Sequence, residues 1–181
     1  MAHDYPKIDP EQHQNILTDQ ILRDSKIFQS ATTVERPRAI ITAGQPGAGK
    51  GSLVRLGQTD LRGNVVTIDP DDLREFHPQV DRLRQQHPYT WSGETHGDAS
   101  QWARELREAA VAQRKNIILD TTMPQADVIK DLQARGYDVE IRAIATHRLE
   151  SELGVDNRFT KDIDRFGHGR HGGGGGGGDG D

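Results

Sequence analysis

A glycine-rich segment that directly follows a short apolar run constrains the fold of this chain more than any other feature. The segment occupies residues 44–52 (GQPGAGKGS), and the apolar run occupies residues 39–43 (AIITA). It fits the G-x-x-x-x-G-K pattern of loops that wrap nucleotide phosphates between a strand and a helix. Glycines permit the tight turn that points backbone N–H groups inward, and Lys50 with the helix N-terminus adds positive charge. The sequence therefore predicts a strand–loop–helix unit that binds a nucleoside triphosphate.

Each residue of this loop is a candidate nucleotide contact. These residues are Gly44, Gln45, Pro46, Gly47, Ala48, Gly49, Lys50, Gly51 and Ser52. Gly51 stands where the usual pattern has the serine or threonine whose hydroxyl binds Mg²⁺, and Ser52 follows one place later. This ending resembles the loops of nucleoside monophosphate kinases. We therefore expect a nucleoside triphosphate as the ligand, with Ser52 as the candidate for binding Mg²⁺.

Composition and charge limit the partners of this chain. The 181 residues carry a formal net charge of −5 without a sustained basic stripe, which argues against nucleic acid as a partner. The absence of cysteine excludes disulfides and thiolate metal sites and suits a reducing compartment. No apolar run approaches the roughly 18 residues that a membrane span needs, and the N-terminus lacks the apolar core of a signal peptide. We therefore expect a cytoplasmic protein with no membrane contact.

Apolar periodicity predicts alternating strands and helices through the middle of the chain. The expected strands are residues 39–43, 64–68, 116–120 and 139–145. The expected helices are residues 50–57, 98–113 and 125–135. Residues 77–97 contain Pro78, Pro88 and Gly93, and we expect loops with short helical turns there. The pattern predicts an α/β fold, a P-loop kinase-like three-layer sandwich around a mostly parallel sheet.

The two ends of the chain differ from this middle. Residues 1–30 are expected to form an N-terminal helical segment, packed on the sheet by an apolar stripe of Ile16, Ile21, Leu22 and Ile27. Residues 38–170 form the expected P-loop kinase domain. Residues 171–181 contain seven consecutive glycines and are expected to be disordered. Because a kinase fold normally continues further, we expect the domain to be incomplete at its C-terminal end.

Three aspartates follow the second expected strand. Asp69, Asp71 and Asp72 lie there, at the edge where parallel strands present their carboxyl ends and bind ligands. A carboxylate facing the γ-phosphate can take the proton of an incoming hydroxyl or position Mg²⁺. We expect Asp71 to be the catalytic base and Asp69 to contact the substrate. Either Asp69 or Asp72 is also suited to cap the helix that begins next.

Further polar candidates follow the third strand and precede the long helix. Asp120 closes a buried strand, and it can bind metal through water, orient the acceptor together with Thr122, or make a structural hydrogen bond. Thr95 and Asp98 can form a capping pair for the helix after them, or Thr95 can face the acceptor.

Arginines after the fourth strand are candidates for stabilising the transferring phosphoryl group. We expect Arg158 and Arg170 to act in this way, with Arg148 and Arg165 as competing positions. A solvated surface position is the alternative for each.

Taken together, these motifs resemble those of the zeta toxin family, the kinase toxins of toxin–antitoxin pairs. The resemblance runs from about residue 12 to residue 170 and keeps the order GQPGAGK, VVTIDPDDLREFHP, TxxDAxxW, NIILDTT and SELGVDNRF. It implies phosphorylation by ATP or GTP of a sugar hydroxyl on UDP-N-acetylglucosamine, which blocks cell-wall precursor synthesis. An antitoxin docked on the N-terminal helix is the implied protein partner.

The resemblance also implies residue roles. Lys50 matches the loop lysine, Asp71 the general base and Arg158 the first lid arginine, whereas Arg170 is the candidate for the second. Asp120 stands where the family usually has glutamate, with Thr122 as the accompanying threonine.

Three departures from the family pattern leave other functions open. Gly51 replaces the usual hydroxyl residue, Asp120 is shorter than glutamate, and Pro124 stands where an arginine often lies near the acceptor. Because proline cannot donate a charged hydrogen bond, a different nucleotide sugar remains possible as the acceptor. Two further functions also stay open: a P-loop kinase of nucleotides or polynucleotide ends, and a nucleotide-binding module without catalysis.

Overall fold

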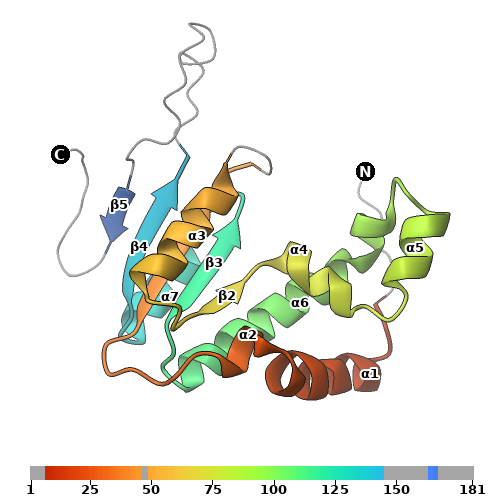
Figure 1. Ribbon diagram of the computed structural model, residues 1–181, viewed down its shortest axis with the longest axis horizontal. Coiled ribbons are helices and arrows are strands. Elements are labelled where there is room, and N and C mark those ends of the chain that lie inside the picture. The colour runs from red at the N-terminus through yellow and green to blue at the C-terminus, as the bar shows by residue number, and fades with distance from the viewer. Residues whose placement is uncertain (1–6, 46–48, 145–162, 167–181) are drawn as a thin grey trace, which may run out of the picture.

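The fold is built on a sheet whose first four strands are parallel (Figure 1). The computed structural model describes residues 7–45, 49–144 and 163–166, the last range as backbone only. The strand order is β2 (Val66–Ile68), β3 (Ile117–Thr121), β1 (Arg38–Ala43), β4 (Asp138–Ala143) and β5 (Ile163–Phe166). β5 pairs antiparallel to β4. The predicted α/β fold with a mostly parallel sheet is confirmed, and the glycine-rich tail lies outside the described residues.

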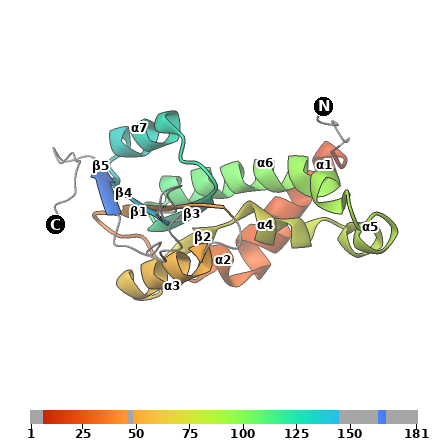
Figure 2. The same cartoon turned by 90° about the horizontal axis from the view of Figure 1, so that it is seen from above.

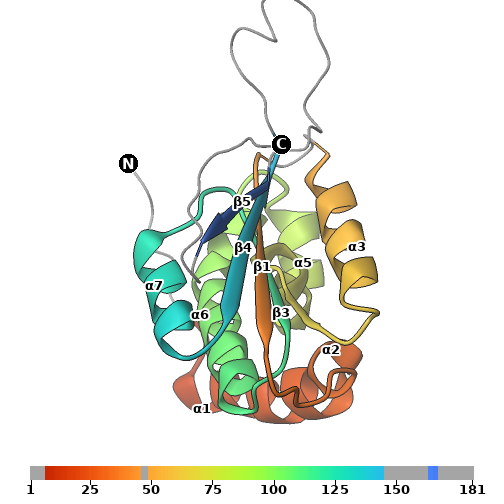
Figure 3. The same ribbon diagram turned by 90° about the vertical axis from the view of Figure 1, so that its left-hand side faces the viewer.

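Helices cover both faces of the sheet. α3 (Lys50–Asp60) lies on one face, and α6 (Trp91–Ala112) and α7 (Ala126–Ala134) lie on the other (Figures 2 and 3). β1 is apolar on both sides because a parallel strand between two helical layers has no solvent face. Under α3, Ile40 and Ile118 pack with Leu61 and Val65. A Cβ built on Gly57 of α3 would lie 3.2 Å from the Ile118 Cδ1 atom, so glycine permits this close approach.

The segment between β2 and α6 is more helical than the sequence predicted. It contains α4 (Pro70–Leu73), the 3₁₀ turn η2 (Arg74–Phe76) and α5 (Val80–Gln86). The prediction of loops up to residue 97 is wrong because α6 begins at Trp91. Glycine costs about 1 kcal/mol inside a helix, and burial of side chains such as Trp102 and Leu106 along α6 outweighs that cost. No helix in the described ranges has the length and apolar character of a bilayer-crossing segment.

The sequence predicted one helix for the N-terminal segment, but the structure has a succession of shorter helical elements there. It comprises α1 (Pro10–Asn15), the π-helical segment η1 (Ile16–Asp24) and α2 (Lys26–Gln29). Hydrogen bonds in a π-helix join residues five apart, so its turn is wider than that of an α-helix. Ile16 and Ile21, five positions apart, therefore lie on the same side, and both are buried in the core. Phe28 is buried as well, whereas the predicted Leu22 and Ile27 are only partly buried.

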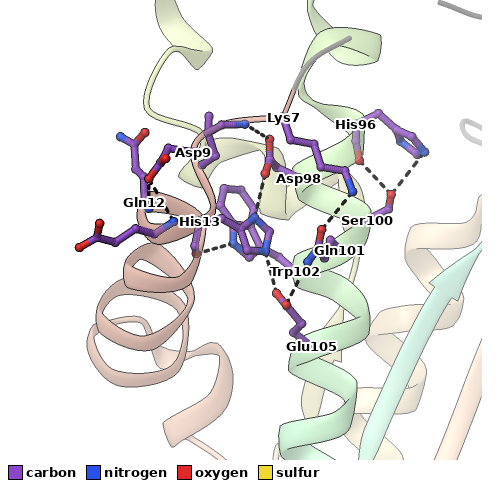
Figure 4. A network of polar contacts seen from close by, with 12 residues as sticks. Lys7, Asp9, Gln12, His13, His96, Asp98, Ser100, Gln101, Trp102 and Glu105 are labelled. Atoms are coloured by element: carbon purple, nitrogen blue, oxygen red, sulfur yellow. Dashed lines mark hydrogen bonds and ion pairs between the residues drawn. The ribbon is translucent and has the colours of Figure 1, made fainter. Parts of the chain in front are cut away.

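A buried histidine fastens this segment to α6 (Figure 4). The ring of His13 stacks on Trp102 with centroids 4.9 Å apart, and the Trp102 indole N–H donates to the His13 carbonyl at 3.1 Å. Nδ1 of His13 lies 2.8 Å from Asp98, and Nε2 lies 2.7 Å from Glu105. Asp98 also accepts the backbone N–H of Ile8 at 3.0 Å. Asp98 therefore lies inside α6 and anchors the N-terminal segment, so the predicted helix-capping role of this residue is wrong.

We expect His13→Ala to lower the free energy of unfolding by about 3–5 kcal/mol, because it removes one partner of the buried Asp98 carboxylate. Urea unfolding followed by circular dichroism measures this change. Gln14→Ala, at the exposed neighbouring position, is the control and should change stability by no more than about 0.5 kcal/mol. Equal losses in the two variants would contradict a fastening role for His13.

Candidate active site

The glycine-rich loop connects the carboxyl end of β1 to the first turn of α3, as predicted. At its start, the Gly44 N–H donates to the Thr121 carbonyl of β3 at 3.2 Å. Gly49 precedes the first residue of α3 with φ of +95°, a left-handed conformation that glycine adopts without strain. The structure thus describes the two ends of the loop, whereas Pro46, Gly47 and Ala48 lie outside the described residues. Nucleotide binding by this loop stays a prediction.

Lys50 lies in an ion pair at the centre of this edge. Its Nζ atom is 3.3 Å from Oδ1 of Asp120 and donates to the Thr121 carbonyl at 3.3 Å. The Thr42 hydroxyl donates to the same Asp120 oxygen at 2.8 Å. Only 12% of the Lys50 side chain and 13% of the Asp120 side chain are exposed, so both are held in place. Asp120 therefore makes the structural hydrogen bond that was one of its three predicted roles, and its contact with an acceptor stays a prediction.

Asp69 caps α4 and lies among other carboxylates. Its Oδ1 atom accepts the Asp71 backbone N–H at 2.9 Å, which confirms Asp69 rather than Asp72 as the capping residue. Burial raises the pKa of Asp69 to about 7, and the charges of Asp72, Asp120 and Asp71 add to this rise against the opposing Asp71 N–H bond. Burial also raises the pKa of Asp72, with Asp71 as the next cause. The ends of β2 and β3 are therefore close enough for their carboxylates to interact.

A cavity adjoins these carboxylates on the α3 side of the sheet. Its volume is about 430 Å³, within the usual range for sites that hold small molecules. Asp69 and Asp72 line it together with Thr67, Gln58 and Lys26. Asp69 thus has space beside it for the predicted substrate contact, which stays a prediction.

Asp71 lies in the first turn of α4 with 63% of its side chain exposed. Arg74 forms an ion pair with it, and Nη2 of Arg74 contacts Nδ1 of His96 on α6 at 3.3 Å. Neither Arg74 nor His96 was predicted from the sequence. The D-x-x-R spacing places Asp71 and Arg74 on one helical face and could have revealed the pair, whereas no local signal points to His96.

The other predicted site residues differ in their exposure and in their hydrogen bonds. The Ser52 hydroxyl accepts a hydrogen bond from Nη2 of Arg55 at 3.3 Å, and Thr122 is exposed just beyond β3. The fully buried Thr95 hydroxyl donates to the carbonyls of Trp91 and Ser92, at 3.0 and 3.2 Å, so α6 itself already uses that group. Arg158 and Arg170 lie outside the described residues.

The donors at this edge suit Mg²⁺ only in part. Hydroxyl and carboxylate oxygens are the ligands that this ion prefers, and Ser52, Asp69 and Asp120 supply them. In the described part of the chain, no group of three acidic or histidine side chains is arranged to hold a metal by itself. Binding of Mg²⁺ by Ser52 and Asp120 therefore stays a prediction.

Comparison with known proteins gives a consistent result. The family model described as Zeta toxin matches residues 11–171. A Toxin zeta from Streptococcus pyogenes is 28% identical over 157 residues, which cover 82% of this chain and 52% of that protein. Toxin PezT from Streptococcus pneumoniae serotype 4 is 33% identical over 116 residues, 62% of this chain and 46% of that protein. The chain thus spans about half the length of the curated relatives it matches.

A solved structure is similar over most of the described fold. It comes from the molecular and structural characterization of the PezAT chromosomal toxin–antitoxin system of Streptococcus pneumoniae. The TM-score is 0.69 and the identity 28%, with 83% of this chain and 62% of that chain covered.

The raised pKa of Asp69 predicts a pH-dependent stability. The folded protein holds the Asp69 proton more tightly than the unfolded chain does, in which the pKa of this aspartate has its ordinary value of 3.8. The stabilisation that this proton provides is therefore complete below pH 3.8 and is lost as the pH rises through about 7. Asp69→Asn keeps the helix cap and removes the charge. We expect the variant to gain thermal stability over the wild type at pH 8 but not at pH 4.

Thermal unfolding at pH 4, 5, 6, 7 and 8 measures this difference. Asp127→Asn, at an exposed position in the first turn of α7, is the control for the loss of one carboxylate, and Asp69→Asn should gain more stability at pH 8 than this variant does. An Asp69→Asn curve that runs parallel to the wild-type curve would refute the expected titration.

Proposed function

The chain belongs to the zeta toxin family, and on that basis we propose that it is a kinase. In this proposal it transfers the γ-phosphate of ATP or GTP to a hydroxyl of UDP-N-acetylglucosamine or a related nucleotide sugar. The phosphorylated sugar nucleotide would no longer serve cell-wall precursor synthesis. The observation that carries the proposal is the ion pair between Lys50, at the end of the glycine-rich loop, and Asp120 near the end of β3, whose charge in turn acts on Asp69 after β2.

Lys50 and the loop bind the nucleotide in this proposal. The loop N–H groups and the N-terminus of α3 face the phosphates, and Lys50 contacts the outer two. Since Lys50 is paired with Asp120, phosphate oxygens compete with this carboxylate for the ammonium group. Mg²⁺ held through Ser52 would neutralise charge on the phosphates. Asp120 can support that ion through a water molecule.

Asp71 is the proposed catalytic base. Its exposed carboxylate takes the proton of the acceptor hydroxyl while the hydroxyl oxygen bonds to the γ-phosphorus. The bond from that phosphorus to the bridging oxygen breaks, and ADP or GDP leaves. Asp69, Asp120 and Thr122 remain the proposed acceptor contacts, whereas the buried Thr95 hydroxyl is already bonded within α6.

Arg158 and Arg170 complete the proposed mechanism. Their guanidinium groups would neutralise the charge that develops on the transferring phosphoryl group, a role for which arginine is well suited.

An antitoxin is the proposed protein partner, by analogy with the PezAT toxin–antitoxin system to which the similar structure belongs. We place its binding on the exposed side of α1 and η1. Deleting residues 1–30 is a poor test because the deletion also removes the buried Ile16, Ile21 and Phe28.

A single substitution tests this docking site without disturbing the core. We expect Gln14→Arg, on exposed α1, to weaken antitoxin binding at least about tenfold, a cost of about 1.4 kcal/mol. Isothermal titration calorimetry measures the affinity. Gln125→Arg, at the start of α7 and apart from α1 (Figure 2), is the matched control. Equal affinities for the two variants would place the antitoxin elsewhere.

The kinase proposal makes a direct prediction about Lys50 and Asp71. With ATP and UDP-N-acetylglucosamine, Asp71→Ala should lower kcat by roughly 10²–10⁴-fold, as expected for loss of a catalytic base. Asp71→Ala should bind ATP normally, whereas Lys50→Ala should bind ATP more weakly because it loses a phosphate contact. Mass spectrometry of the sugar nucleotide and calorimetry with ATP measure the two effects.

Asp81→Ala removes an exposed carboxylate from the first turn of α5 and is the control, expected to keep full activity. If the wild type phosphorylates a different UDP-sugar, the kinase proposal holds and only the identity of the acceptor changes. ATP binding without phosphorylation of any acceptor would favour the binding module over the kinase.

A further inference from the structure

The backbone of Asp71 is fixed, but its side chain is not buried. The N–H of Asp71 is bonded to the Asp69 cap, so the position of its Cα atom is set by the start of α4. The side chain is 63% exposed, and an exposed aspartate usually has several rotamers available. A catalytic base must nevertheless present one oxygen to the reacting hydroxyl within hydrogen-bond reach. Some neighbouring group is therefore needed to hold the carboxylate.

The charges around Asp71 would push its carboxylate away. Asp71 contributes to raising the pKa values of Asp69 and Asp72, which shows that the three carboxylates interact. Arg74 supplies the opposite charge, one helical turn further along the chain.

Arg74 is well suited to hold Asp71 because the Arg74 side chain is itself fixed by burial and by a second contact. Only 14% of its side chain is exposed, and its guanidinium pairs with Oδ1 of Asp71 through Nη1. Nη2 lies 3.3 Å from Nδ1 of His96 on the neighbouring helix α6. The planar guanidinium therefore contacts both groups at once, which the point charge of lysine cannot reproduce.

The contact with Arg74 determines which ring nitrogen of His96 carries the proton. Arginine has donors only, so Nδ1 of His96 accepts. The proton of the neutral ring is then on Nε2, which faces the Ser100 hydroxyl at 3.5 Å, and that hydroxyl donates to the His96 carbonyl at 2.9 Å (Figure 4). Hydrogen bonds thus run from α6 through Arg74 to the carboxylate.

We propose that Arg74 is a positioning residue for the catalytic base, and that His96 holds Arg74 in place. This inference rests on the proposed function. Arg74 takes Oδ1 of Asp71 and leaves Oδ2 for the acceptor hydroxyl, whose proton Oδ2 receives during transfer.

Double-mutant kinetics test this role. Arg74→Met should lower kcat about 100-fold, the size of effect expected from misplacing a catalytic group. The acceptor KM and the ATP affinity should change less than about threefold, because Arg74 acts through Asp71 and not on bound ligands. Arg74→Lys should recover part of the loss. In an Asp71→Asn background, Arg74→Met should cause no further loss, since the group it positions is already absent.

Two further variants sharpen the test. His96→Phe removes the acceptor for Nη2, and we expect a smaller loss in kcat, about tenfold, that disappears in the Arg74→Met background. Arg82→Met is the control, since Arg82 is an exposed arginine on α5 that bonds Gln79 and Gln86. It should keep the wild-type kcat. Additive losses of Arg74→Met and Asp71→Asn, or a raised acceptor KM with unchanged kcat, would overturn the positioning role.

Crystal structures of the wild type and Arg74→Met test the inference without any reaction. We expect a single Asp71 rotamer paired with Arg74 in the wild type and a displaced or multiple rotamer in the variant. An unchanged Asp71 side chain in Arg74→Met would overturn the inference. If no nucleotide sugar is phosphorylated by the wild type, the proposed function fails while this structural result still decides the role of Arg74.

Discussion

The ion pair between Lys50 and Asp120 organises the carboxyl edge of the sheet. It joins the first residue of α3 to the end of β3, and the Thr42 hydroxyl ties the same carboxylate to β1. Both side chains are nearly buried, so their charges interact through protein more than through water. A phosphate that engages Lys50 must replace an existing partner. The loop lysine is thereby held in place instead of extending into solvent, as the proposed binding of a nucleotide requires.

The aspartates at this edge differ because their surroundings differ. Asp120 is paired with a cation, Asp69 is a desolvated helix cap with a pKa raised to about 7, and Asp71 is exposed and paired with Arg74. Different environments let neighbouring carboxylates take separate roles in acid–base chemistry. Of these three aspartates, Asp71 combines an exposed side chain with a fixed partner, Arg74. The proposed base needs both, because it must be reached by the acceptor hydroxyl and must be held in position. α6 contributes through His96, and the same helix holds the N-terminal segment through Asp98 and Glu105.

Sequence patterns predicted what depends on local chemistry. The apolar strands, the connection of β1 to α3 by the glycine-rich loop and the capping aspartate after β2 are encoded by residues close in sequence. The structure confirms the strands, the two ends of the loop and the cap. Contacts between distant residues carried no such signal. His13 and Asp98 are 85 positions apart, and Arg74 meets His96 across two helices. The start of α6 was misjudged because Gly93 was interpreted as a loop residue, although tertiary packing along the helix outweighs its low propensity.

The three departures from the family pattern have different structural consequences. A Cβ built on Gly51 would contact only the Arg55 side chain, at 3.4 Å, so packing does not demand glycine there. The hydroxyl of Ser52 instead lies beside Arg55, one turn along α3. Asp120 is shorter than glutamate but still reaches Lys50, because Lys50 begins the helix directly above the strand end. The shorter side chain therefore preserves the contact with the loop lysine. At the third position, where the family pattern often has arginine, Pro124 supplies no cation, so the proposed acceptor would have to be recognised by other residues.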